Sequence, residues 1–222
     1  MAGSRLVPVF PLPDVVFFPR TTLPLHVFER RYRRMVEDVL AADGRLAVAL
    51  LAKGWEADYD GSPAYHEIAT IGRIEDLERT PDGRFLFRLV GEARVRLGTV
   101  ASGTPYRTAS ATAIPERALD EREASVRQAN LALLASQGLL VRELSRGEVP
   151  GIVLDESLSF EETLNGICAS LPTEAAIRQN LLELDDLPTR QREAARILDE
   201  LLRRVLHLKS LRSRDEGPSG LN

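Results

Sequence analysis

The chain has 222 residues, a net charge of -4, and 44% hydrophobic against 28% charged side chains. This composition is typical of a globular protein, and no stretch approaches the roughly 20 consecutive apolar residues that a membrane span needs. The amino terminus lacks the apolar core of a secretory signal, and the single cysteine, Cys168, cannot form an internal disulfide. We therefore expect cytoplasmic residence and no contact with a membrane.

The first half of the sequence is dominated by short apolar runs that Pro and Gly interrupt, a pattern typical of strands. Pro81-Asp82-Gly83 has the composition of a turn, and the alternation that follows it predicts a strand with at least one buried face. The predicted strands are Leu6–Phe10, Leu46–Leu51, Glu67–Glu78, Phe85–Leu97 and Tyr106–Ile114.

One helix is expected within this region. Its apolar stripe has the spacing of one helical face, and its opposite side is charged. The residues of the stripe are Phe28, Tyr32, Met35, Val36, Val39 and Leu40. Gly44 is suited to the left-handed position past the end of a helix. Several strands with a single inserted helix predict a small, partly closed β-barrel or folded sheet.

After residue 114 the composition shifts to the good helix formers Ala, Leu, Glu, Arg and Gln. A long helix is predicted over residues 116–146. A capping box is predicted from Ser159 and Glu162, and two more helices are predicted to start at Pro172 and Pro188. The fold class is therefore α+β. The expected parts are a β-rich subdomain over residues 1–114, a helical bundle over 115–209 and a disordered tail over 210–222.

The last predicted helix carries apolar residues at alternating spacings of four and three, typical of a seam that packs on a neighbouring helix. These residues are Ala194, Leu198, Leu201, Val205 and Leu208. The seam is interpreted as bundle core, and whether it also forms a homodimer is left open.

Motifs for nucleotide and nucleophile chemistry are absent from the sequence. There is no phosphate-binding Gly-Lys-Ser/Thr loop, no dinucleotide fingerprint and no Gly-x-Ser-x-Gly elbow. His26, His66 and His207 each lack a second ligand at the spacing of local metal motifs. We expect no catalytic residues, no metal site and no cofactor.

Two neighbouring segments, Val7–Pro19 and Leu23–Arg33, resemble the opening of the substrate-binding domain of Lon proteases. The resemblance extends over nearly the whole chain. Further matching segments are Ile71–Ile74, Asp82–Phe85, Val90–Leu97, Leu171-Pro172 and Gln179–Glu183.

The resemblance implies a β-rich, PUA-like pseudo-barrel followed by a helical bundle. In full-length Lon proteases this region captures unfolded or tagged substrates and passes them to an ATPase and a Ser-Lys protease domain, neither of which this sequence contains. The implied function is a non-catalytic protein-binding module or adaptor. Its partners would be unfolded or specific client proteins and a separate protease or chaperone.

Aromatic residues in polar loops are the candidate binding residues, because a ring there supplies a large contact area. Phe17 and Phe18 lie in a Pro-bounded loop, and Trp55, Tyr59 and Tyr65 lie in a Gly-rich, acidic segment. The alternative interpretation is that these rings cap the barrel core.

RNA binding is the alternative function, because PUA-like folds elsewhere bind RNA. Its candidate residues are Arg30, Arg31, Arg33 and Arg34 on the predicted helix. The acidic net charge opposes this function, since phosphate-binding surfaces are normally basic, and nucleic acid is therefore the less favoured partner. An unrecognised enzyme is the third class.

Overall fold

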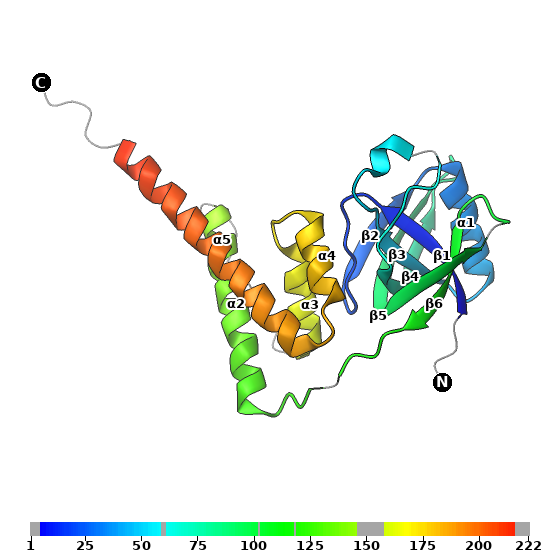
Figure 1. The fold of residues 1–222 in the computed structure, drawn as a ribbon. Helices are drawn as coiled ribbons and strands as arrows, with labels where there is room; N and C mark the ends of the chain where they lie inside the picture. Colours follow the sequence, from blue (N-terminus) through cyan, green and yellow to red (C-terminus); the bar gives the residue numbers. More distant parts are fainter. Residues whose placement is uncertain (1–4, 59–60, 102, 118, 146–157, 216–222) are drawn as a thin grey trace, which may run out of the picture.

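The computed structural model describes residues 5–58, 61–101, 103–117, 119–145 and 158–215. Within them, a six-stranded sheet and five α-helices form an α+β fold, with the strands in one half and most helices in the other (Figure 1). The strands are β1 (Arg5–Leu12), β2 (Thr22–Val27), β3 (Arg45–Leu50), β4 (Ile68–Arg79), β5 (Phe85–Ala101) and β6 (Arg107–Ala113). The predicted fold class is confirmed.

The sheet closes into a barrel because β5 pairs with β6 as well as with β4. The order is β2-β5-β4-β3-β1-β6, with β1 and β3 parallel and the other pairs antiparallel. The 17-residue β5 takes part twice: its first half pairs with β2 and its second half with β6. Alternation along β5 buries Phe85, Phe87 and Leu89, as the sequence pattern predicts.

Strand β2 was missed in the sequence pattern. Its residues alternate between exposed and half-buried, and Pro24 lies at its centre, so the segment gives no clear strand signal. Within the described residues β2 pairs only with β5, so its other edge has no partner strand there.

Helix α1 (Arg30–Ala41) covers one opening of the barrel. Tyr32, Met35 and Val39 are buried, as the apolar stripe predicts. The two ends of that stripe were wrong. Phe28 is 59% exposed because it precedes the helix, which begins only at Arg30, and Leu40 in the last turn is 42% exposed although its neighbour Val39 is buried.

The second half contains helices α2 (Ala124–Leu144), α3 (Phe160–Ser170), α4 (Ala175–Glu183) and α5 (Leu187–Asp215). Helices α2 and α5 lie side by side as a long pair, and α3 and α4 lie between α5 and the barrel (Figure 1). The predicted capping box is present: Glu162 N donates to Ser159 Oγ at 3.2 Å, and Ser159 N donates to Glu162 Oε2 at 2.8 Å.

Helix α5 continues to Asp215, which differs from the disordered tail predicted to start at residue 210. Its last described turns contain Leu and Arg, which are good helix formers, so the helix extends past the end of its apolar seam. None of the described helices is both long and apolar enough to cross a membrane.

Candidate functional site

A hollow of about 240 Å³ lies at the end of the barrel beside α1. We call it the rim groove. Its apolar lining comes from β1, β2, α1 and the end of β3, and its charged lining from α1 and β6. The lining side chains that matter below are Phe10, Leu12, Leu25, Phe28, Tyr32, Arg31 and Arg107. Strands and a helix position most of these groups, which gives the groove a rigid frame, and Phe28 lies in the short connection between β2 and α1.

Phe28 is the exposed aromatic residue of the rim groove. It lies directly after β2, and its ring meets the His26 ring edge-on at a centroid distance of 5.9 Å. An isolated exposed apolar residue is ordinary on a protein surface. Phe28 differs because it borders an apolar hollow, which gives a bound side chain contacts on several sides.

The charged side of the groove is formed by Arg31 and Arg107. Arg31 Nε donates to Glu29 Oε2 at 3.1 Å, and its guanidinium lies 4.7 Å from the centroid of the Tyr32 ring. Arg107 donates to the carbonyl of Pro63 at 2.5 Å. Its guanidinium also lies 5.4 Å from the centre of the Tyr65 ring.

The loop that carries Trp55 begins and ends at this groove. Leu51 and Pro63, at the two ends of the loop that carries Trp55, both line the groove. Trp55 begins a short 3-10 helix, Trp55–Asp58, and is half-buried. Tyr65 is also half-buried, and its ring packs against the barrel core. Tyr59 lies outside the described residues.

Phe17 and Phe18 were candidate binding residues, but both side chains are buried. Phe17 is 3% exposed in the barrel core, and Phe18 is 0% exposed among the side chains of the helical half. The loop between β1 and β2 passes between the two halves, so its rings are buried on both sides. Thr70 Oγ1 holds this loop by donating to the Phe17 carbonyl at 2.6 Å.

The four arginines proposed for RNA do not form one free basic surface. Arg31 and Arg34 pair with carboxylates of their own segment, Glu29 and Asp38. The Arg33 guanidinium lies against Gly83 of the neighbouring turn, and Arg30 is exposed. This arrangement weakens the case for a phosphate-binding surface on α1.

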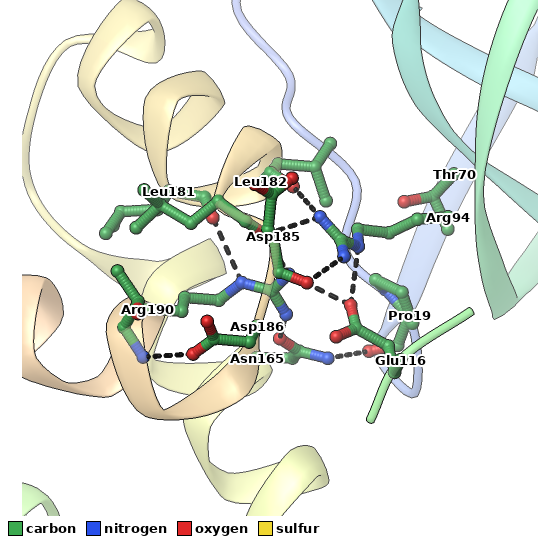
Figure 2. A network of polar contacts seen from close by, with 12 residues as sticks. Pro19, Thr70, Arg94, Glu116, Asn165, Leu181, Leu182, Asp185, Asp186 and Arg190 are labelled. Atoms are coloured by element: carbon green, nitrogen blue, oxygen red, sulfur yellow. Dashed lines mark hydrogen bonds and ion pairs between the residues drawn. The ribbon is translucent and has the colours of Figure 1, made fainter. Parts of the chain in front are cut away.

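A second polar region joins the two halves, and we call it the junction. Figure 2 shows Arg94 from β5 and Arg190 from α5 converging on Glu116. The two arginine side chains are 1% and 0% exposed, and they lie 2.5 and 2.9 Å from Glu116 Oε1. Burial, and secondly the charge of Arg190, lowers the pKa of the Arg94 guanidinium.

Both arginines also bind backbone carbonyls at the end of α4. Arg94 donates to the carbonyls of Leu182 and Leu184 at 2.9 and 2.6 Å. Arg190 Nε donates to the carbonyl of Leu181 at 3.0 Å, and another of its nitrogens donates to Asn165 Oδ1 at 2.9 Å. Buried charges that are paired and hydrogen-bonded in this way mark a structural contact between the halves.

A larger cleft of about 620 Å³ opens beside the junction. It is lined by charges of both signs, among them Arg20, Arg117 and Glu161, and burial raises the pKa of the Glu161 carboxyl. Several of the carboxylates already bind backbone groups or arginines, as Glu121 does with the Phe160 amide. Among the residues described, no three His, Cys, Asp or Glu side chains are grouped so as to hold a metal ion.

Comparison with known families identifies the domain. Residues 6–200 match the model of the ATP-dependent protease La (LON) substrate-binding domain. The chain belongs to this family.

Individual Lon relatives agree with this assignment. Lon protease 2 of Syntrophobacter fumaroxidans is 27% identical over 93% of this chain and 27% of its own length. Lon protease of Escherichia coli is 26% identical over 83% of the chain and 23% of its own length. The chain therefore spans about a quarter of these curated relatives.

Solved Lon domains share the fold. The N-terminal domain of the Mycobacterium avium complex Lon protease superposes with a TM-score of 0.63 at 22% identity, covering 88% of this chain and 98% of that one. The Lon N-terminal domain protein of Xanthomonas campestris gives a TM-score of 0.58 at 24% identity, covering 89% of this chain and 97% of that one.

Within this Lon domain, sequence reasoning missed Phe28 as a surface residue and Arg94 and Arg190 as junction residues. The exposure of Phe28 could have been predicted from the position of Glu29. An acidic residue before a run of arginines is as reasonable a helix start as His26, and a start there leaves Phe28 outside the helix. Nothing local marks Arg94 or Arg190, because each depends on a contact that is distant in the chain: Arg94 meets the Leu182 carbonyl across 88 positions, and Arg190 meets Glu116 across 74.

Proposed function

We propose that the rim groove binds unstructured segments of other proteins, and that the domain recognises such clients without acting on them chemically. The observation that carries this proposal is Phe28, exposed beside an apolar hollow on a rigid frame. The family supports it, because the matched domain is described as substrate-binding. Trp55 and Tyr65 extend the proposed contact area on one side of the groove.

The further parts of the proposal concern partners. A separate protease or chaperone would receive the bound clients, since binding alone changes nothing in them. Exposed leucines near the end of α5, Leu206 and Leu208, are where a second copy would pack if the chain forms a dimer. Cytoplasmic residence stays a prediction.

The experiment measures binding of a fluorescent, reduced and alkylated protein that cannot refold. Replacement Phe28→Ser is expected to weaken binding about tenfold, equivalent to about 1.4 kcal/mol, because a central aromatic contact is lost. The matched control is Leu131→Ser, a change at a residue of similar exposure on α2, which should leave binding unchanged. Equal affinities of the two variants would contradict the proposal.

Two further measurements limit the site and the ligand class. Unchanged client binding by a folded Trp55→Ala variant would remove its loop from the site. Client capture by apolar contact should tolerate salt, whereas RNA binding should fall steeply as salt rises. Retention of RNA that is lost with salt would favour the RNA-binding alternative.

A further inference from the structure

The backbone around the rim groove offers few hydrogen-bond donors to an added strand. Pro11, Pro13 and Pro63 line the groove, and Pro24 lies at the centre of β2, whose outer edge is unpaired among the described strands. A strand that joins a sheet needs a regular row of N–H and C=O groups at its edge. Proline has no N–H, so these positions interrupt such a row.

The side chains of the groove, by contrast, offer a complete set of contacts. Phe10, Leu12 and Leu25 provide apolar lining, and Phe28 adds an exposed ring. A large apolar side chain of a client would be surrounded there on several sides, which is what makes a side-chain anchor effective.

The charge at the edge of the groove selects the neighbours of that anchor. Arg107 has no ion pair within the part of the chain that the structure describes, and it donates a hydrogen bond to the neutral carbonyl of Pro63. Arg31, on the same edge, is already paired with Glu29. An arginine that has no counter-charge among the described residues and lies beside an apolar hollow is complementary to a carboxylate on the ligand.

We infer that the rim groove takes an extended client segment through its side chains alone, with an aromatic side chain in the hollow and an adjacent carboxylate on Arg107, and without strand addition. This inference rests on the proposed function and names the class of segment that the site prefers.

The test uses labelled Gly/Ser-rich peptides with a central Asp-Phe-Asp sequence and the full chain. Ester bonds in place of the amides on both sides of the phenylalanine remove the peptide's N–H donors with little change in shape. Affinity is expected to change less than about twofold, because no backbone bond is made. A loss of about tenfold or more in the ester peptide would show strand addition and overturn the inference.

The charge is tested by a double-mutant cycle. Asn in place of both peptide Asp residues is expected to weaken binding about two- to fivefold, the range of partly exposed ion pairs. In Arg107→Gln this difference should vanish, whereas in the control Arg203→Gln, on exposed α5, it should persist. A difference that survives in Arg107→Gln would overturn the assignment of the carboxylate to Arg107.

Two peptide results separate the inference from the proposed function. If the parent peptide binds and an Asp-Ala-Asp version does not, the anchor is confirmed whatever the ester result is. If the parent peptide fails to bind while Phe28→Ser still weakens capture of the alkylated client, the proposed function survives and the Asp-Phe-Asp preference is wrong. If neither the parent peptide nor the alkylated client binds to the chain, the proposed function itself fails.

Discussion

Apolar side chains are usually buried and charged side chains exposed, and the rim groove and the junction each depart from one half of this rule. At the rim groove a large apolar side chain, Phe28, is exposed, and at the junction two charged side chains, Arg94 and Arg190, are fully buried. Buried charges that are paired and bonded to backbone carbonyls mark a structural contact, whereas a mostly exposed ring beside a hollow adds little to the packed core. The comparison teaches that the buried contacts of the junction and the proposed recognition site lie apart, so mutations should separate stability from client binding.

The strongest test compares two phenylalanines ten positions apart. Phe18 is 0% exposed at the junction and Phe28 is 59% exposed at the rim groove. Phe18→Ala should lower the free energy of unfolding by about 3–5 kcal/mol, because it leaves a cavity. Phe28→Ala should change it by less than about 0.5 kcal/mol. Urea unfolding of both variants measures the difference, and similar losses would refute the separation.

The central carboxylate of the junction should matter nearly as much. Glu116→Gln removes the carboxylate that the guanidinium groups of Arg94 and Arg190 both contact, and breaking a buried pair of this kind costs about 3–5 kcal/mol. Chemical denaturation measures the loss. The matched control is Glu78→Gln on exposed β4, expected within about 0.5 kcal/mol of the parent chain. A loss below about 1 kcal/mol in Glu116→Gln would show that the junction does not depend on this charge.

A backbone contact gives a smaller effect. A Cβ atom on Gly91 would lie 2.4 Å from the carbonyl oxygen of Phe18, and backbone atoms cannot rotate away. Gly91→Ala should therefore destabilise the chain by about 1–3 kcal/mol. Gly166→Ala in α3 meets no atom within 4 Å and should stabilise by about 0.5–1 kcal/mol, since Ala favours helix over Gly. Thermal unfolding measures the midpoint temperature of both variants. Equal shifts of the two midpoints would contradict the close approach of Gly91 to the Phe18 carbonyl.

The smallest effect appears only at high pH. Burial, with the hydrogen bond to Asp38 at 2.8 Å, raises the pKa of Tyr106 to about 12 from 10.0. The folded chain thus holds this proton more tightly than the unfolded chain, so the contribution is complete below about pH 10 and is lost as pH rises toward 12. In Tyr106→Phe the fall of the urea midpoint between these pH values should be shallower. If the urea midpoint fell equally with pH in the parent chain and in Tyr106→Phe, the pH dependence would come from groups other than Tyr106.

The sequence predicted the elements whose signals are local. The stripe from Tyr32 to Val39 and the capping box at Ser159 each depend on residues within a few turns of one another, and the structure contains both. Strand β2 was not predicted because Pro24 interrupts its alternating pattern. Phe28 failed because its spacing from Tyr32 continues the helical period, although the chain is not yet helical there.

The candidate site was harder to predict than the fold. Loop composition indicated Phe17 and Phe18 as candidate binding residues, with capping of the core as the alternative, and long-range packing buries Phe17 in the barrel core and Phe18 against the helical half. The rim groove brings together Phe10 of β1, Phe28 of the connection after β2 and Arg107 of β6, and no spacing in the sequence shows that they meet.

The junction also has a kinetic consequence. Its contacts join distant parts of the chain: Asn165 Nδ2 donates to the Pro19 carbonyl across 146 positions, and Arg190 meets Glu116 across 74. Contacts of such separation form slowly, because a long loop must close first. We therefore expect the barrel, reported by the fluorescence of the single tryptophan, to refold before the helical half docks. During synthesis, Phe18 then stays uncovered until α5 leaves the ribosome, and in that interval the newly made chain has the exposed apolar character of a client itself.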